Sequence, residues 1–317
     1  MWNYRHYPAG IGIRLCLMYA SGKLYSRLPL FKGAWHKATL AYRASLFRTF
    51  RRYQGDILAC HEREWSDGET VENAPVFVFW WQGLDGAPDI VKSCIASMRR
   101  HIGSHPLVVI TRDNVWDYVD IPAYIYEKVE GKIITLTHFS DILRFALLER
   151  YGGLWLDATI MVLRDITDDV FAARFFTQKA KLAHEDDTFR FAGAPYWSGY
   201  LIGGHKGLSF FSLMKDLFFD YWKHNDIQLD YFLIDDYMAW LARDCRHVAS
   251  MLAKADIRTD DMYFLAGSFP RIFDGAFLNE YRSKDIGFNK LGYKNLKAWP
   301  DDSVYSMLVK TDGRCLE

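Results

Sequence analysis

Several common signatures of phosphate and metal binding are missing from this chain. It contains no G-x-x-x-x-G-K-[ST] loop and no G-x-G-x-x-G after a predicted strand, which disfavours a P-loop kinase and a Rossmann dehydrogenase. Its five cysteines are widely spaced, with no C-x-x-C pair and no histidine partner at zinc-ligand spacing. We therefore expect reduced thiols, as in a cytosolic protein.

Long apolar runs are also lacking. The best candidate, residues 11–20, is interrupted by Arg14 and falls well short of the roughly 20 apolar residues that a membrane-spanning helix needs. No signal-peptide cleavage pattern is convincing, so the chain is expected to stay inside the cell. The 317 residues, 50% of them apolar, contain no evident repeat and allow one large globular domain, alone or with an appendage.

Acidic residues are absent from residues 1–55, although the whole chain has 39 basic and 39 acidic residues. Ten Lys or Arg fall in this segment, which leaves 29 basic against 39 acidic residues in the remainder. Such a split indicates an anionic partner for the basic segment. Nucleic acid is disfavoured as that partner, because the remainder is acidic and no nucleic-acid motif is present.

Residues 33–54 have the pattern of an amphipathic helix. Tyr42, Leu46, Phe50 and Tyr53 lie along one side, and basic residues such as Arg48 lie opposite, together with Lys37, Arg51 and Arg52. This pattern is typical of a helix at a membrane interface, where each basic residue adds about 1 kcal/mol of attraction to an anionic leaflet. The alternative is a helix that packs its apolar side on the rest of the protein and leaves its charges solvated.

These observations predict two parts. Residues 1–70 form a basic helical segment, and residues 1–55 attach it to an anionic membrane surface. Residues 71–317 form the main globular domain. The expected location is cytoplasmic, peripheral on the inner face of the cell membrane.

The second part begins with alternating strand and helix patterns. Residues 75–83 form a continuous apolar run that ends in glycine, as in a strand buried on both faces. A helix follows over 88–103, and a second buried strand leads into polar residues over 106–114. This alternation favours an α/β fold with a parallel or mixed sheet. Ligands bind at the carboxyl ends of such strands, so we expect residues 81–83, 111–114 and Asp157 to meet at one crevice.

Residues 139–160, FSDILRFALLERYGGLWLDATI, carry the most specific pattern. An amphipathic helix over the first part places Asp141 and Arg144 three residues apart, largely off the apolar stripe. Gly152 or Gly153 is expected to end that helix. A strand from Leu154 to Ile160 then follows, in which Trp155, Asp157 and Thr159 share one face. The bland interpretation is a surface ion pair followed by a strand end.

The whole string resembles the signature SDxxRxxxLyxyGGxxlDxD of glycosyltransferases with the GT-A fold, which include certain mannosyltransferases and the large glucosylating toxins. It is most similar to the capsular polysaccharide synthesis proteins, whose version ends in D-A-T. The resemblance implies a GT-A-like mixed sheet flanked by helices. It also implies that Asp141 and Arg144 hold hydroxyls of a donor sugar, beside Trp155, and that Asp157 is the first acid of a D-x-D turn that meets the ribose and a metal on the diphosphate.

Thr159 departs from that signature, because it occupies the position of the second acid. The resemblance implies Mn²⁺ or Mg²⁺ at Asp157 and Thr159, yet a neutral hydroxyl is a poorer ligand for such ions than a carboxylate. Three alternatives remain open. The metal binds mainly through Asp157 and the diphosphate, another acid completes the site, or the enzyme depends weakly on metal.

Three further segments resemble the same family. YFLIDDY offers Asp235, and next to it Asp236, as the missing carboxylate or as a group that orients the acceptor. Acids also favour the start of any helix, which is the simpler explanation. NKLGYK resembles an element that supplies a lysine near the diphosphate, which makes Lys290 and Lys294 candidates. The segment after the first strand implies that Trp81 and Gln82 contact the nucleotide.

The expected function is transfer of a sugar from a nucleoside-diphosphate donor, UDP-linked by preference, to a glycan or lipid-linked acceptor in cell-surface polysaccharide synthesis, with retention of anomeric configuration. Asp141, Arg144, Asp157 and Asp235 are the expected catalytic residues. One alternative is a degenerate transferase that serves as a membrane scaffold, motivated by Thr159. The other is a metal-dependent phosphohydrolase, which the spacing around Asp157 disfavours.

Overall fold

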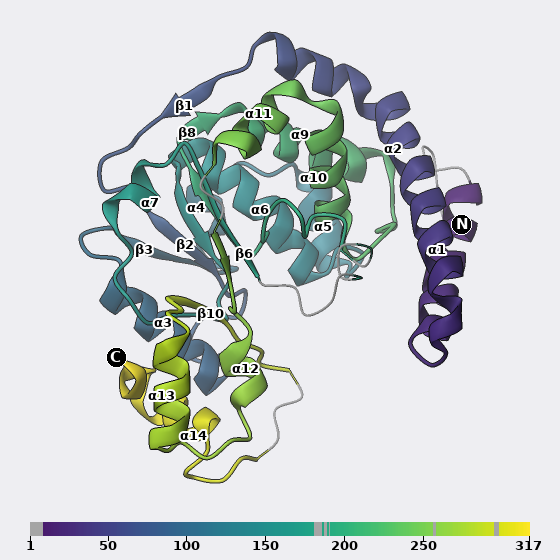
Figure 1. The fold of residues 1–317 in the computed structure, drawn as a ribbon. Coiled ribbons are helices and arrows are strands. Elements are labelled where there is room, and N and C mark those ends of the chain that lie inside the picture. The colour runs from purple at the N-terminus through teal and green to yellow at the C-terminus, as the bar shows by residue number, and fades with distance from the viewer. Residues whose placement is uncertain (1–8, 181–185, 187–188, 190, 256–257, 295–297) are drawn as a thin grey trace.

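The structure is a computed structural model that describes residues 9–317 except 181–185, 187–188, 190, 256–257 and 295–297. Its centre is a six-stranded mixed sheet, covered by helices on both faces (Figure 1). In spatial order, its strands are β3 (Leu107–Ile110), β2 (Val76–Phe79), β4 (Gly153–Leu156), β7 (Leu201–Gly204), β6 (Phe175–Ala180) and β9 (Arg258–Asp260). The predicted α/β class, a mixed sheet flanked by helices, is confirmed, and the arrangement is consistent with a GT-A-like fold.

The parallel half of the sheet follows the predicted alternation. Strand β2 pairs in parallel with both β3 and β4. The helix between β2 and β3 is α3 (Asp89–His101), and the helix before β4 is α6 (Leu136–Tyr151). Because β2, β3 and β4 run the same way, their carboxyl ends lie at one edge, where ligands bind in sheets of this kind.

Strand β7 runs antiparallel to β4 and β6 and makes the sheet mixed. Two small antiparallel pairs lie beside it. They are β1 (Asp67–Glu69) with β8 (Lys206–Leu208), and β5 (Ile160–Val162) with β10 (Phe288–Lys290). The register of the second pair places Lys290 opposite Ile160, next to the turn that follows β4.

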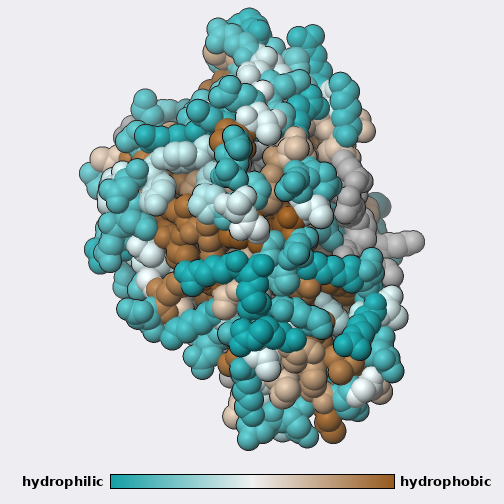
Figure 2. All heavy atoms as spheres, turned by 90° about the vertical axis from the view of Figure 1, so that its left-hand side faces the viewer, coloured by the Kyte–Doolittle hydropathy of each residue, from teal (hydrophilic) through white to brown (hydrophobic). Residues whose placement is uncertain are grey.

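Each face of the sheet packs on its own hydrophobic core, because side chains alternate along a strand. Phe77 and Trp155 belong to the core beneath α6 and α9 (Ser209–His224), whereas Val76 and Leu154 belong to the core beneath α3. Trp155 therefore faces away from Leu154, as predicted. From outside, hydrophobic residues show mainly as a band across the middle of the face in Figure 2, with hydrophilic residues above and below it.

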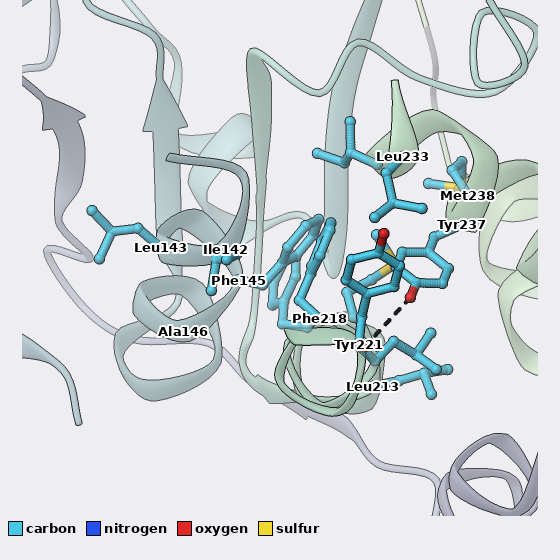
Figure 3. Close-up of a cluster of buried hydrophobic side chains, with 14 of the residues drawn as sticks. Ile142, Leu143, Phe145, Ala146, Leu213, Phe218, Tyr221, Leu233, Tyr237 and Met238 are labelled. Atoms are coloured by element: carbon cyan, nitrogen blue, oxygen red, sulfur yellow. Dashed lines mark hydrogen bonds between the residues drawn. The ribbon is translucent and has the colours of Figure 1, made fainter. Parts of the chain in front are cut away.

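The larger core is rich in aromatic rings. Figure 3 shows Phe145 of α6 and Phe218 of α9 side by side, with ring centroids 6.0 Å apart. Phe218 also meets Tyr237 of α10 (Leu233–Asp244) at 5.2 Å. Further helices are α4 (Val115–Tyr118), α5 (Ala123–Glu130), α7 (Asp168–Ala172), α11 (Arg246–Lys254), α12 (Phe264–Ser268), α13 (Gly275–Ser283), α14 (Val304–Thr311) and the short 3₁₀ turn η2 (Arg314–Leu316).

Two glycines lead the chain from α6 into β4. Gly152 caps the helix at φ +67°, and Gly153 follows at φ +89°, backbone conformations that favour glycine. A Cβ atom on Gly153 would lie 2.1 Å from the carbonyl oxygen of Pro75, so no side chain fits there. The predicted end of the helix is confirmed. This tight turn starts β4 in parallel with β2, so that both strands have their carboxyl ends at the same edge of the sheet.

The basic N-terminal segment forms a helical hairpin of α1 (Ala9–Tyr25), the 3₁₀ turn η1 (Pro29–Phe31) and α2 (Lys32–Arg63), which lies along the outside of the molecule (Figure 1). The predicted helix over 33–54 exists within α2. Its apolar side is not free, however, because the side chains expected at a membrane are buried in the larger core, beside α9 and α10. They are Tyr42, Leu46 and Phe50.

The expectation that this side of α2 lies in a membrane is therefore wrong, and the alternative of packing on the domain holds. Tyr53, expected on the same side, is exposed. An amphipathic pattern specifies an apolar partner but not whether that partner is lipid or protein. Residues 1–70 and 71–317 share one core, and the predicted boundary at residue 70 stays a prediction.

All five cysteines are free thiols. In the part of the chain that the structure describes, no helix combines the length and apolar content needed to cross a membrane.

Replacing Phe50 by Ala tests the integration of α2. The Phe50 ring is fully buried and lies 4.6 Å from Tyr237 and 5.4 Å from Trp240, centroid to centroid. We expect the free energy of unfolding in urea to fall by about 3–5 kcal/mol. Leu40→Ala is the matched control, because Leu40 is an exposed side chain of the same helix. Equal effects of the two substitutions would contradict the shared core.

Candidate functional site

A pocket of about 700 Å³ opens at the carboxyl ends of β2 and β4. Its walls come from the segment after β2, the start of α6, the turn after β4 and the segment that begins with the end of β10. Seven predicted site residues line it, namely Trp81, Gln82, Trp155, Asp157, Thr159, Lys290 and Lys294. Residues 111–114, also expected here, do not line the pocket, although the Arg112 N–H donates to the carbonyl of Trp81 at 3.0 Å.

The turn after β4 presents Asp157 and Thr159 to the pocket. The predicted strand from Leu154 to Ile160 is wrong in its second half, because β4 ends at Leu156 and β5 begins only at Ile160. A turn closes where the Ile160 N–H donates to the carbonyl of Asp157 at 2.9 Å. The two residues therefore share a tight turn rather than one face of a strand.

Asp157 is surrounded by hydrogen-bond donors. Its Oδ1 accepts from the indole N–H of Trp155 at 3.0 Å and lies 3.7 Å from Nη2 of Arg144. Its Oδ2 accepts from Nζ of Lys290 at 2.7 Å. Burial acts to raise the pKa of Asp157, but the charges of Lys290 and Arg144 and the hydrogen bonds outweigh it, so the pKa lies below its usual range. The carboxylate is therefore ionised at neutral pH.

Asp141 and Arg144 form an ion pair in α6, with Arg144 Nη2 2.8 Å from Asp141 Oδ1. The sequence placed both residues off the apolar stripe, yet both are buried and neither lines the pocket. Arg144 also donates from Nη1 to the carbonyl of Gly199 and lies over the Trp155 ring, 5.1 Å from its centroid. The pair is thus buried beside the turn, and is not the surface ion pair of the bland interpretation; its predicted role in holding a donor sugar stays a prediction.

His138 is a residue that the sequence interpretation missed. It is buried one helical turn before Asp141, and its Nε2 accepts from the indole N–H of Trp222 at 3.0 Å. Because an indole nitrogen can only donate, Nε2 is the acceptor in this bond, and Nδ1 lies 3.1 Å from the side-chain nitrogen of Gln228. Nδ1 lies 3.5 Å from Asp141 Oδ2. The i, i+3 spacing on the helix was the available signal.

Asp235 and Asp236 lie in the first turn of α10, as the helix-start explanation requires. Asp235 Oδ1 accepts from the indole N–H of Trp197 at 2.9 Å. Burial raises its pKa to about 6; Trp197 and Arg144 act against this rise, and the Asp141 carboxylate adds to it. Asp236 points instead toward α2, 3.5 Å from the Tyr42 hydroxyl. Asp235 is therefore the acid of this pair whose pKa is affected by the charges of Asp141 and Arg144.

Both predicted lysines line the pocket. Lys290 donates to Asp157 and also to the Thr159 hydroxyl oxygen, at 2.9 Å. Lys294 is exposed, with Nζ 5.7 Å from the Tyr293 ring centroid. Trp81 and Gln82 also line the pocket; the Trp81 ring packs edge-on against Phe139 at 5.7 Å, and Gln82 is exposed. The pocket lining thus combines aromatic and cationic side chains.

A divalent metal would have to use the oxygens of Asp157 and Thr159. Both carboxylate oxygens of Asp157 already accept hydrogen bonds, from Trp155 and Lys290, and the Thr159 hydroxyl accepts from Lys290. Among the residues that the structure describes, no group of three His, Cys, Asp or Glu side chains could hold a metal ion. The donor set of this turn does not fit a divalent metal that requires several oxygen ligands.

The raised pKa of Asp235 predicts a pH effect on stability. A carboxyl group with a raised pKa in the folded state stabilises the fold below its unfolded pKa, and this contribution is lost as pH rises through about 6. The variant Asp235→Asn has no carboxyl group at this position and so lacks this loss of stability. The free energy of unfolding of the variant minus that of the wild type should therefore increase from pH 4 to pH 7, by at most about 3 kcal/mol. Urea unfolding of both proteins at pH 4 and pH 7 measures this change. The same difference between variant and wild type at both pH values would contradict the raised pKa of Asp235.

A family model described as capsular polysaccharide synthesis protein matches residues 35–308. A search of curated proteins gives no significant match. The matched region begins inside α2 and ends inside α14, so it contains the sheet, the pocket and the buried pair of α6. The chain therefore belongs to the family of capsular polysaccharide synthesis proteins.

Proposed function

We propose that this protein is a glycosyltransferase that takes a sugar from a nucleoside-diphosphate donor in the pocket at the ends of β2 and β4. The family is glycosyltransferase-like and concerns capsular polysaccharide synthesis. The observation that carries the proposal is the Asp157–Thr159 turn with Lys290 bound to it, in a pocket that Trp81 also lines. That arrangement combines an aromatic side chain for a base with a fixed cation for a diphosphate.

The charges of the pocket suit the leaving group of such a transfer. Breaking the bond between sugar and diphosphate places negative charge on the departing oxygen, and preorganised cations stabilise that charge. Lys290 and Lys294 both line the pocket. Behind them, Asp141 and Arg144 hold the turn in place, so the donor meets a site that needs little rearrangement.

The finer features of the reaction rest on the family resemblance. The proposed donor is a UDP-sugar, and the proposed acceptor is a glycan or a lipid-linked glycan. Related glycosyltransferases of this type retain the anomeric configuration, and we propose retention here. Asp235, beside the buried pair, is the proposed group that orients the acceptor.

We also propose that the protein works at the inner face of the cell membrane, held by α1 rather than by the buried side of α2. Ile13, Leu17 and Leu24 share one side of α1, and their side chains are 63%, 57% and 46% exposed. Exposed Arg14 and Lys23 flank this stripe, and residues 1–55 contain no acid. An apolar stripe with basic flanks suits the surface of an anionic bilayer.

Donor binding tests the first proposal. We expect one of the UDP-, GDP- or CMP-sugars to raise the melting temperature, since a ligand at 100 times its Kd adds about 2.7 kcal/mol of stability. Slow donor hydrolysis should accompany the rise. Asp157→Asn should lower both effects at least tenfold, because it removes the charge that aligns Lys290 while keeping the shape. Differential scanning fluorimetry and release of nucleoside diphosphate measure them, with and without Mn²⁺.

Asp165→Asn is the control, because the Asp165 side chain is 86% exposed and pairs with His101 away from the pocket. It should behave as the wild type does. Stabilisation without any turnover, also in the presence of acceptor glycans, would favour the scaffold alternative. No response to any donor would contradict the proposed function.

Membrane docking is tested by sedimentation with anionic and with neutral vesicles. The double variant Ile13→Glu, Leu17→Glu should lose most binding to anionic vesicles, because each fully buried side chain of this size contributes roughly 1.5–3 kcal/mol. Ile272→Glu serves as the control, since Ile272 is 61% exposed outside the hairpin. Equal recovery of all three proteins with the vesicles would show that α1 is not the docking surface.

A further inference from the structure

The ammonium group of Lys290 lies inside the turn that the family signature assigns to a metal. Its Nζ is 2.7 Å from Asp157 Oδ2 and 2.9 Å from Thr159 Oγ1. The Lys290 side chain is 18% exposed, and Nζ also lies 4.9 Å from the centroid of the Tyr200 ring. A cation is thus already held at the centre of this site by one carboxylate, one hydroxyl and one aromatic face.

The backbone fixes this position. Lys290 is the last residue of β10 and pairs with Ile160, the first residue of β5. Its N–H donates to the carbonyl of Met262 at 2.7 Å, and the next residue, Leu291, donates to the carbonyl of Thr159 at 2.9 Å. The lysine is therefore attached to the turn by strand pairing as well as by its side chain, which preorganises the ammonium group.

The residue opposite the lysine fits this role. A second carboxylate at position 159 would leave the turn with two negative charges, the usual surroundings of a divalent metal. Thr159 supplies a neutral acceptor instead, and a single ammonium group balances the single charge of Asp157. The carboxylate of Asp141 is already paired with Arg144 at 2.8 Å. Asp141 is therefore not a free ligand for a metal.

We propose that Lys290 is the resident cation of the donor site and replaces the divalent metal on the diphosphate. This inference rests on the proposed function. In the transfer, the bond between the anomeric carbon and the diphosphate oxygen breaks, and its electron pair goes to that oxygen. The acceptor hydroxyl oxygen bonds to the anomeric carbon, and its proton passes to the departing oxygen. Lys290 donates hydrogen bonds to the diphosphate throughout and is not consumed.

Asp157 and Lys294 take defined parts in this arrangement. Asp157 is a positioning residue that aims Nζ of Lys290 into the pocket. Lys294, exposed four residues later on the same wall, is a second cation for the two or more charges of the diphosphate. Lys290 carries the larger effect, because it is partly desolvated and fixed, whereas an exposed lysine is screened by water.

Calorimetric titration of the full chain with UDP, in EDTA and then in Mn²⁺, tests the proposal. We expect the Kd of the wild type to agree within about twofold between the two buffers. Lys290→Met should weaken binding at least tenfold in both, because it removes the charge and keeps the length. The control is Lys284→Met, since Lys284 pairs with Asp261 at 3.2 Å outside the pocket. Melting temperatures and circular dichroism verify that each variant is folded.

A second variant keeps the test decisive if Lys290→Met is unstable. Thr159→Asp combined with Lys290→Met restores the D-x-D pattern and removes the resident cation, so UDP binding should become dependent on Mn²⁺. Wild-type binding that disappears in EDTA would overturn the role of Lys290 and leave the donor site standing. No binding of UDP, GDP or CMP in either buffer would contradict the proposed function itself, and the present inference with it.

Discussion

The structure around the pocket depends on a chain of alternating charges that joins three separate segments. Asp141 and Arg144 pair within α6, Arg144 reaches Asp157 in the turn after β4, and Asp157 holds Lys290 at the end of β10. Buried charges of this kind are tolerated only when each has a partner of opposite sign. Every member therefore fixes the next one, and the two walls of the pocket are joined through side chains whose positions the backbone also sets.

The two ends of this row of charged side chains differ in exposure: one end is buried, and the other end is partly exposed. Arg144 is 4% exposed and Asp141 is 10% exposed at its side chain, whereas Asp157 is 27% and Lys290 18% exposed. At the buried end, His138 also contacts Asp141 and accepts a hydrogen bond from Trp222. The charges of Asp141 and Arg144 are therefore paired within the protein. Asp157 and Lys290, at the other end, line the pocket.

Much of this architecture could be predicted from local sequence, and the exceptions have physical causes. The apolar run at 75–83, the helix after it and the glycines at 152–153 predict β2, α3 and the end of α6, because each of these signals is local. The close approach of Pro75 to Gly153 is not local and could not be predicted. The burial of Asp141 and Arg144 could not be read from periodicity, since a pattern sorts side chains by polarity and not by partner. The same limit applies to α2. Its apolar side had a partner in α9 and α10, which no sequence pattern distinguishes from lipid.

Thr159 and Lys290 could each be noticed in the sequence, but not as one unit. They lie 131 positions apart, and only the pairing of β5 with β10 brings them together. In the sequence alone, a threonine in place of an acid suggests a metal site that has lost a ligand. In the structure, Thr159 lies beside the ammonium group of Lys290, and the charges of the turn are matched because the one carboxylate of Asp157 balances that one cation. In the donor site that we propose, the neutral hydroxyl accepts a hydrogen bond from Lys290 without adding a negative charge that would hold Lys290 back from a diphosphate.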